Sequence, residues 1–190
     1  MAGRPSIHDR ILRVAHDLFY RDGIRATGID RVIGESEVSK VTFYRHFHSK
    51  NELVLAFLDH RHQRWMTWFA DALCRNGGTA GGGAAAVVPA LAEWFRDGAF
   101  RGCAFINSVV ELGGDFPEVA AIARRHKDEM TEAIGHLLPP SERRENQAQA
   151  IALAVDGAIM RAQVDGTPDA ALEALGLAID AITPPYCPPQ

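Results

Sequence analysis

The chain has 190 residues, a hydrophobic fraction of 47% and a formal net charge of −4. This fraction supports a packed core and excludes a globally disordered chain, while no apolar run reaches the roughly 18 residues that a transmembrane helix needs. The three cysteines lack the spacing of a metal site or a disulfide framework, so we expect reduced thiols in a cytoplasmic protein with no membrane partner.

The first helix is predicted to begin at Ser6, which forms a capping signature with Asp9, and to end at Gly23. Three further helix-start signatures follow within Thr27–Lys50. They are Thr27-x-x-Asp30, Ser39 and Ser49-x-x-Glu52. Two short helices separated by a tight turn are typical of the helix-turn-helix, which places its second helix in the major groove of DNA.

The distribution of charge supports this interpretation. Residues 1–50 hold nine Lys or Arg and six acidic residues, which gives +3, whereas the remainder holds 11 basic and 18 acidic residues, which gives −7. A basic N-terminal segment attached to an acidic remainder favours phosphate contact at one end of the chain only. We therefore predict a DNA-binding helix-turn-helix domain over residues 1–50.

The remaining residues are also predicted to be helical, because Ala is abundant and strand-like alternation is absent. A glycine-rich loop at residues 76–83 follows a long helix that begins at Asn51. The other helices are expected to run from Pro89 to Gly98, from Cys103 to Leu112, from Pro117 to Leu138, from Ser141 onward, and from a capping Thr167 to Ile182. The sequence thus predicts an all-α fold of about nine helices, with a second domain over residues 51–190.

The segment Phe19–Leu53, FYRDGIRATGIDRVIGESEVSKVTFYRHFHSKNEL, closely resembles the TetR family of one-component bacterial transcriptional regulators. The resemblance implies an all-helical homodimer, a C-terminal domain that binds a small apolar effector, and a dimer interface made mainly by the last two helices. It also implies a repressor that the effector releases from a palindromic operator. Two departures stand out: Glu37 replaces the Gly that usually precedes the Val, and Val41 replaces a common Gly or Ala.

The predicted third helix buries Phe43 and Phe47 and leaves its other side chains available to DNA. By resemblance, Thr27, Tyr44 and Lys50 contact phosphates, and the alternative for Tyr44 and His46 is packing at the edge of the module. Arg4 either reaches into a minor groove or belongs to a free tail. The candidate DNA-binding residues are Thr27, Ser39, Lys40, Val41, Thr42, Tyr44, Arg45, His46 and Lys50.

The second domain offers candidates for the effector pocket and the dimer interface, and core packing is the alternative for each aromatic residue. The polar candidates Asn107, Glu111 and Asp156 either orient a ligand, satisfy a helix end or contact a partner chain. The candidate pocket residues are Trp65, Trp68, Phe69, Trp94, Phe105, Asn107, Glu111, Met130, Asp156 and Met160. The candidate interface residues are Ile151, Val155, Ile159, Ala162, Leu172, Leu175 and Ile179.

Four other functions are alternatives to a DNA-binding regulator. A thiol-based redox or electrophile sensor would act through Cys103, which follows Arg101-Gly102 at a predicted helix start, and the alternative is a small buried residue. The pairs His46/His48 and His60/His62 are two residues apart, so they point to opposite sides of a helix and predict no metal site. No nucleophile elbow, phosphate loop or HExxH motif is present, so we expect neither an enzyme nor a cofactor. The basic residues at Lys40, Arg45 and Lys50 argue against a scaffold that has lost DNA binding.

Overall fold

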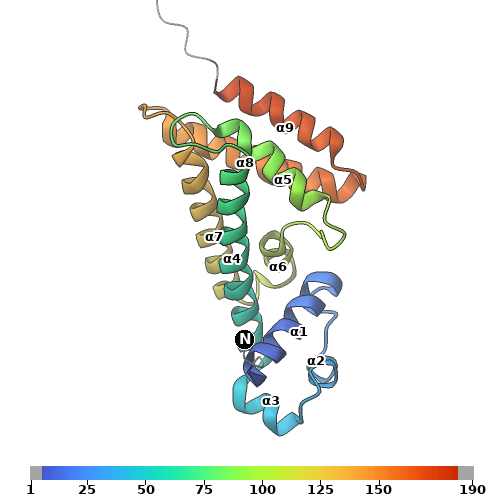
Figure 1. The fold of residues 1–190 in the computed structure, drawn as a ribbon. Coiled ribbons are helices and arrows are strands. Elements are labelled where there is room, and N and C mark those ends of the chain that lie inside the picture. The colour runs from blue at the N-terminus through green and yellow to red at the C-terminus, as the bar shows by residue number, and fades with distance from the viewer. Residues whose placement is uncertain (1–5, 184–190) are drawn as a thin grey trace, which may run out of the picture. The chain divides into compact units, whose positions relative to one another are not determined.

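The computed structural model describes residues 6–183, and this part of the chain is entirely helical (Figure 1). The all-α prediction is therefore confirmed. Arg4, the proposed minor-groove arm, lies outside the described residues. The helices are α1 (Ile7–Asp22), α2 (Ile29–Glu35), α3 (Lys40–His46), α4 (Lys50–Arg75), the short 3-10 helix η1 (Ala84–Ala86), α5 (Val87–Phe95), α6 (Ala104–Leu112), α7 (Pro117–His136), α8 (Arg144–Asp165) and α9 (Asp169–Ile182).

The helices form two compact units, which do not follow the predicted boundary at residue 50. The first unit comprises the chain up to Arg64 together with Ala104–Arg124, and the second comprises Trp65–Cys103 and the chain from Arg125 onward. Helices α4 and α7 therefore each contribute residues to both units. Helix α6, which the sequence placed in the C-terminal domain, belongs to the same unit as α1, α2 and α3.

The core of the first unit is built from the inward faces of its helices. Ile11 and Leu18 of α1, Val32 of α2 and Phe43 of α3 are all fully or almost fully buried. His16 of α1 is buried beside Phe57 of α4, and this burial lowers the pKa of His16 below its usual range. These buried side chains give the helices of the first unit a small common core.

The predicted helix caps are confirmed at three positions. Ser6 Oγ accepts a hydrogen bond from the Asp9 backbone N–H at 3.1 Å, and Gly23 ends α1 with φ 90°. Ser39 and Ser49 accept from the N–H groups of Thr42 and Glu52, each at 3.1 Å. Each serine satisfies an N–H that would otherwise have no partner in the first turn of its helix.

The capping predictions at Thr27 and Thr167 are wrong. Gly28 occupies the N-cap of α2, and the fully buried Thr27 donates its hydroxyl hydrogen to the Gly23 carbonyl at 2.8 Å instead. Pro168 occupies the N-cap of α9, without a side-chain cap. In addition, α5 ends before Gly98 and α8 begins after Ser141, because turns occupy these flanking residues.

The turn between α2 and α3 contains a strained residue. Glu37 has φ 52°, and it is the one non-glycine residue with a positive φ among residues 6–183. The Arg10 guanidinium of α1 donates to the Glu37 carbonyl at 3.4 Å, which holds the turn against the first helix. Glu37 stands where the TetR family usually has glycine, a residue that adopts a positive φ without strain.

We expect Glu37→Gly to stabilise the protein, because glycine adopts a positive φ without a steric penalty. The free energy of unfolding should rise by about 0.5–1 kcal/mol. Relief of the left-handed strain raises it, and the greater entropy of glycine in the unfolded chain offsets part of this gain. Urea denaturation measures this change. Glu37→Ala is the matched control, since it removes the same charge but keeps Cβ, and an equal gain in both variants would refute the strain argument.

The second unit is organised around the pairing of α8 with α9, which also packs against α5 and η1. Gly166, with φ 72°, forms the left-handed turn between α8 and α9. All seven side chains predicted to form a dimer interface are buried in this packing (Ile151, Val155, Ile159, Ala162, Leu172, Leu175 and Ile179). They therefore have little surface left to offer a second chain.

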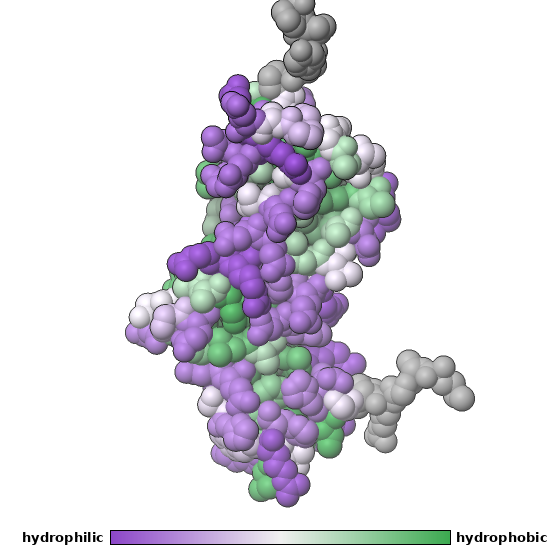
Figure 2. All heavy atoms as spheres, turned by 90° about the vertical axis from the view of Figure 1, so that its left-hand side faces the viewer, coloured by the Kyte–Doolittle hydropathy of each residue, from purple (hydrophilic) through white to green (hydrophobic). Residues whose placement is uncertain are grey.

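A different set of apolar side chains on α8 and α9 is exposed. Leu153, Val164 and Leu177 are 74%, 69% and 67% exposed, and Met160 is 44% exposed. On the face drawn in Figure 2, hydrophilic residues cover most of the described surface, and hydrophobic side chains appear in separate patches. Among residues 6–183, no helix combines the length and the apolar character needed to span a bilayer.

Candidate nucleic-acid interface

Helix α3 is held in a defined orientation by its buried face and its N-cap. Phe43 and Phe47 are 0% and 2% exposed, so one side of the helix is fixed against the core of the first unit. The Ser39 hydroxyl, which caps the helix, also lies 2.8 Å from Thr42 Oγ1. The opposite side of α3 must therefore face outward.

The outward side of α3 carries apolar, aromatic and cationic groups together. Val41 is 67% exposed and Tyr44 is 39% exposed, with the Tyr44 ring set edge-on to the buried Phe43 at 5.3 Å. Lys40 lies 3.5 Å from Asp30, in an exposed ion pair that contributes little stability. Arg45 is exposed, and no ion pair joins it to any residue that the structure describes. Its guanidinium is available to a phosphate or a guanine edge.

The other predicted DNA-binding residues are less exposed. His46 is half-buried, with its ring 6.2 Å from that of His8, and Thr42 is half-buried beside Ser39. Burial lowers the pKa of Lys50, and the nearby Glu111 carboxylate opposes this shift. Thr27 is fully buried with its hydroxyl bonded, so its side chain does not belong to the exposed surface.

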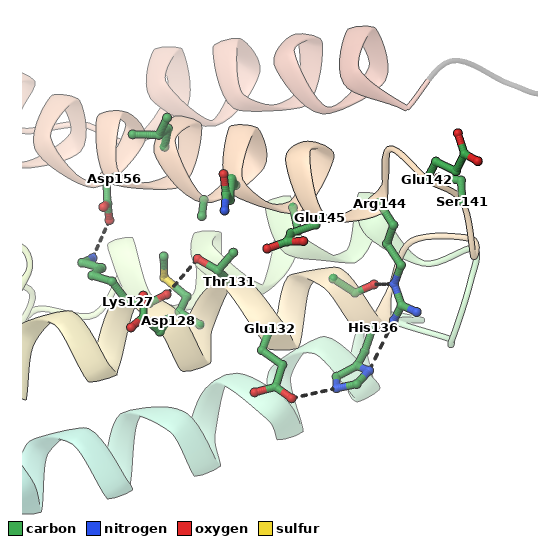
Figure 3. Close-up of a pocket in the computed structure, with 16 residues that line it drawn as sticks. Lys127, Asp128, Thr131, Glu132, His136, Ser141, Glu142, Arg144, Glu145 and Asp156 are labelled. Atoms are coloured by element: carbon green, nitrogen blue, oxygen red, sulfur yellow. Dashed lines mark hydrogen bonds and ion pairs between the residues drawn. The ribbon is translucent and has the colours of Figure 1, made fainter.

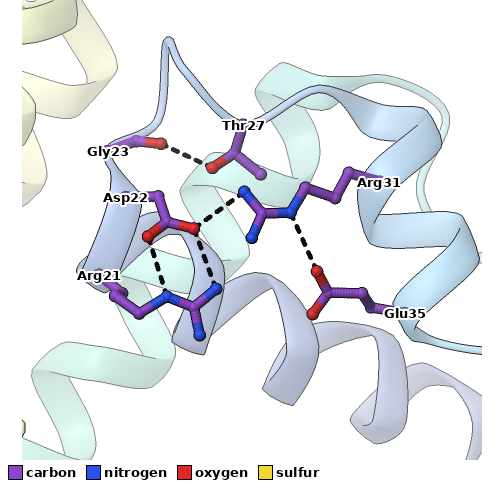
Figure 4. Close-up of polar contacts among 6 residues, drawn as sticks. All are labelled: Arg21, Asp22, Gly23, Thr27, Arg31 and Glu35. Carbon is purple, nitrogen blue, oxygen red and sulfur yellow. Dashed lines mark hydrogen bonds and ion pairs between the residues drawn. The ribbon is translucent and has the colours of Figure 1, made fainter.

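A polar network connects the end of α1 to α2 (Figure 4). The Asp22 carboxylate accepts from Arg21 Nε at 2.9 Å, and it also pairs with Arg31 Nη1 at 2.9 Å. Arg31 Nε in turn donates to Glu35 at 2.9 Å. The hydrogen bond from Arg21 holds the pKa of Asp22 below its usual range, with Arg31 acting in the same direction.

Glu111 of α6 binds the turn that follows α1. Its carboxylate accepts from the backbone N–H of Arg25 at 2.7 Å and of Ile24 at 3.3 Å. A second acid of this segment, Asp115, pairs with the Arg25 guanidinium at 3.1 Å. Glu111 therefore satisfies two N–H groups of a turn that lies 86 and 87 positions earlier in the chain, and not the end of a helix, whose unsatisfied groups would be carbonyls.

Comparison with known proteins supports the helix-turn-helix. Residues 11–57 match the family model described as bacterial regulatory proteins, tetR family. A segment of 60 residues is 37% identical to the HTH-type transcriptional regulator QacR of Staphylococcus aureus, and one of 58 residues is 41% identical to the HTH-type transcriptional repressor Rv3405c of Mycobacterium tuberculosis. Each match covers about a third of this chain, and the chain spans only 32% and 31% of the length of the two relatives.

The likeness to solved structures extends over almost the whole chain. The TetR-family transcriptional regulator SCO4454 of Streptomyces coelicolor aligns with a TM-score of 0.83 and 27% identity, over 95% of this chain and 90% of that one. A putative TetR transcriptional regulator of Streptomyces avermitilis aligns with a TM-score of 0.77 and 25% identity, over 94% and 98% of the two chains. The helix-turn-helix of this chain therefore matches the TetR family, and the fold of the chain is similar to that of TetR-family regulators.

The candidate effector residues do not gather at one site in the structure. Trp65, Trp68, Phe69 and Trp94 form one aromatic cluster in the second unit. Met130 and Asp156 line a groove between α7 and α8. Met160 is exposed on α8, and the remaining three candidates, Phe105, Asn107 and Glu111, lie on α6 in the first unit.

The groove between α7 and α8 has a volume of about 990 Å³, and charged side chains are among the residues that line it (Figure 3). Lys127 and Asp156 form an ion pair across it, and Arg144 Nε donates to the Gly135 carbonyl at 2.7 Å. The carboxylates of Asp128 and Glu145 also line the groove. Asp156 is therefore paired within the chain, which accounts for a carboxylate in an otherwise apolar stretch of α8.

The cysteine and histidine candidates gain no support from the structure. Cys103 is 4% exposed, so an oxidant in solution has little access to its thiol. Within residues 6–183, no group of His, Cys, Asp and Glu side chains has the arrangement of a metal site.

We expect Glu111→Gln to destabilise the first unit, because one of the two carboxylate oxygens becomes an NH2 group that cannot accept a hydrogen bond from the backbone. One backbone N–H then loses its partner, and the hydrogen bond that remains is no longer charge-assisted. The free energy of unfolding should fall by about 1 kcal/mol, a value reduced for the partial exposure of the carboxylate. Urea denaturation measures the change. Asp115→Asn is the control, since its exposed pair with Arg25 should contribute much less, and equal losses in the two variants would contradict this role for Glu111.

Proposed function

We propose that the protein is a DNA-binding transcriptional regulator that inserts α3 into the major groove. The observation that carries this proposal is the outward face of α3, where Val41, Tyr44 and the unpaired Arg45 project from a helix fixed by two buried phenylalanines. The cationic groups suit phosphates and guanine edges, and the Val41 side chain suits a thymine methyl group. Ser39, Lys40, Thr42, His46 and Lys50 border this face and complete the proposed interface.

The protein is proposed to act as a homodimer through the exposed face of α8 and α9. Leu153, Met160 and Val164 are spaced at i, i+7 and i+11 on α8, so they lie along one side of that helix. Leu177 adds a similar side chain on α9, flanked by the exposed Ala174 and Ala181. A two-fold dimer with two reading heads requires a palindromic operator, with half-sites about one helical turn apart or a multiple of it.

Regulation is proposed to follow from a small-molecule effector that the second unit binds, with repression as the sign of control. Helix α4 contributes residues to both units. A conformation of the second unit that the effector favours can therefore change the position of the helix-turn-helix through this helix. A coupling free energy of about 1–3 kcal/mol would weaken operator binding roughly 5- to 150-fold. Such a regulator is expected to work in the cytoplasm.

The decisive experiment is the selection of bound fragments from the source genome, followed by fluorescence anisotropy on the recovered sequences. A palindromic fragment should bind at least about 1,000-fold more tightly than unrelated duplex DNA. Equal binding of all fragments, or no binding at low salt, would sink the proposal.

Substitutions on α3 should separate affinity from sequence preference. Tyr44→Phe removes only the hydroxyl group, so it should weaken binding about fivefold per half-site at every operator sequence, as expected for one lost hydrogen bond. Val41→Ala should instead change the ranking of operators that differ at one base pair. Anisotropy titrations over a panel of single-base operator variants measure both effects, and an unchanged ranking for Val41→Ala would remove Val41 from base readout.

The dimer proposal predicts the effect of a charge on the α8–α9 face. Leu177→Arg should give a monomer in light scattering and lose roughly 100-fold in affinity for the palindrome, because the second half-site no longer binds as part of one molecule. Val110→Arg is the matched control, since Val110 is 82% exposed on α6, in the first unit. A dimeric Leu177→Arg variant would place the interface elsewhere.

A further inference from the structure

The three tryptophans of the chain all belong to one aromatic cluster in the second unit. Trp65 and Trp68 of α4 and Trp94 of α5 have ring centroids 5.9 Å, 5.6 Å and 6.2 Å apart. Phe69 stacks on Trp65 at 4.7 Å, and the ring of His126 meets Trp65 edge-on at 4.9 Å. Trp65 is therefore in contact with four other rings.

The indole nitrogen of Trp65 has no hydrogen-bond partner among residues 6–183. The residue is 6% exposed, and its Nε1 atom is among the buried polar atoms without an acceptor in the described part of the chain. A buried indole N–H usually finds a partner, because leaving the donor unpaired costs free energy that an apolar group would not. Neither of the other two tryptophans has an unpaired buried nitrogen of this kind.

The cluster also reaches the surface of the second unit. Trp68 and Trp94 are half-buried, as is Phe100, whose ring lies 5.1 Å from Trp94 at an interplanar angle of 87°. A planar ligand that enters between these outer rings would exchange ring–ring contacts for ring–ligand contacts of the same kind. The free energy of the aromatic contacts therefore changes little when the ligand enters. The hydrogen bond to the unpaired N–H of Trp65 then decides which aromatic ligands bind more tightly.

We infer that this cluster is the effector site of the proposed regulator, and that it binds an uncharged planar aromatic ligand carrying one hydrogen-bond acceptor. Trp65 Nε1 donates to the acceptor, while Trp68 and Trp94 cover the ligand's ring. The inference rests on the proposed effector response. Aromatic rings also attract cations, but a cation without an acceptor leaves the Trp65 N–H unpaired.

The groove between α7 and α8 is the competing site, and its chemistry differs. Its lining includes Asp128, Glu145 and the Lys127–Asp156 ion pair, so it suits a cationic ligand. None of its side chains has a buried polar atom without a partner. A ligand chosen for its acceptor therefore distinguishes the two sites.

Quinoline and naphthalene provide the test, because the two molecules have the same shape and differ by one ring nitrogen that accepts a hydrogen bond. Dissociation constants are measured by quenching of the intrinsic tryptophan fluorescence, at a pH where quinoline is uncharged. The ratio of the naphthalene constant to the quinoline constant should fall roughly 3- to 10-fold in Trp65→Phe, which keeps an aromatic ring but removes the donor. Comparing ratios cancels the different hydration of the two probes.

Two variants serve as controls. Trp68→Phe makes the same substitution in the same cluster but should keep the parental ratio, because the Trp68 nitrogen is not among the buried unpartnered atoms. Glu145→Gln in the α7–α8 groove should change neither constant. An unchanged ratio in Trp65→Phe, or a loss of quinoline binding in Glu145→Gln, would overturn the inference.

A second measurement covers the case in which Trp65→Phe does not fold. The parental protein has three indole N–H signals in a ¹⁵N correlation spectrum, one for each tryptophan. Quinoline should shift one of them downfield, as a new hydrogen bond does, and naphthalene should not; equal responses to both probes would overturn the inference. Operator binding is measured separately by anisotropy, so a failure of the proposed DNA binding leaves the Trp65 result readable by itself.

Discussion

The burial of Phe43 and Phe47 is the constraint that fixes the orientation of α3, the helix proposed to enter the major groove. These two side chains, four residues apart, fix the rotation of a helix that has only seven residues and little stability of its own. The Ser39 cap then fixes where the helix begins. Because the inward face is fixed in this way, the outward face is fixed as well. Val41, Tyr44 and Arg45 are exposed because they lie opposite the two buried phenylalanines.

Much of this could be predicted from the sequence, because helix caps and apolar spacing act over a few residues. Local reasoning correctly predicted the burial of Phe43 and Phe47 and the caps at Ser6, Ser39 and Ser49. The same local reasoning gave a wrong prediction for the cap at Thr27. A Thr followed three residues later by Asp30 has the form of a capping box, but the fully buried hydroxyl is bonded to the preceding Gly23 carbonyl instead. Tertiary burial decided between two local hydrogen bonds of similar strength.

The features that the sequence did not give depend on contacts between distant segments. Apolar spacing identified the inward residues of α8 and α9, such as Val155 and Leu175, but could not tell whether they face another chain or a neighbouring helix of the same one. In the structure these side chains are buried within the chain, whereas Leu153, Val164 and Leu177 remain exposed on the same two helices. Likewise, no local pattern could reveal that the carboxylate of Glu111 binds the N–H groups of Ile24 and Arg25, since 86 positions or more separate the partners.

The Asp22–Arg31–Glu35 network has a consequence for how the proposed DNA binding would respond to salt. Its arginine is about half exposed, so dissolved ions screen these attractions between α1 and α2 as they screen attraction to phosphates. Raising the ionic strength therefore weakens the contacts between α1 and α2 at the same time as it weakens the attraction of the protein to DNA phosphates. The slope of log affinity against log salt would then exceed the value set by released counterions alone, and a count of phosphate contacts taken from that slope would be too high.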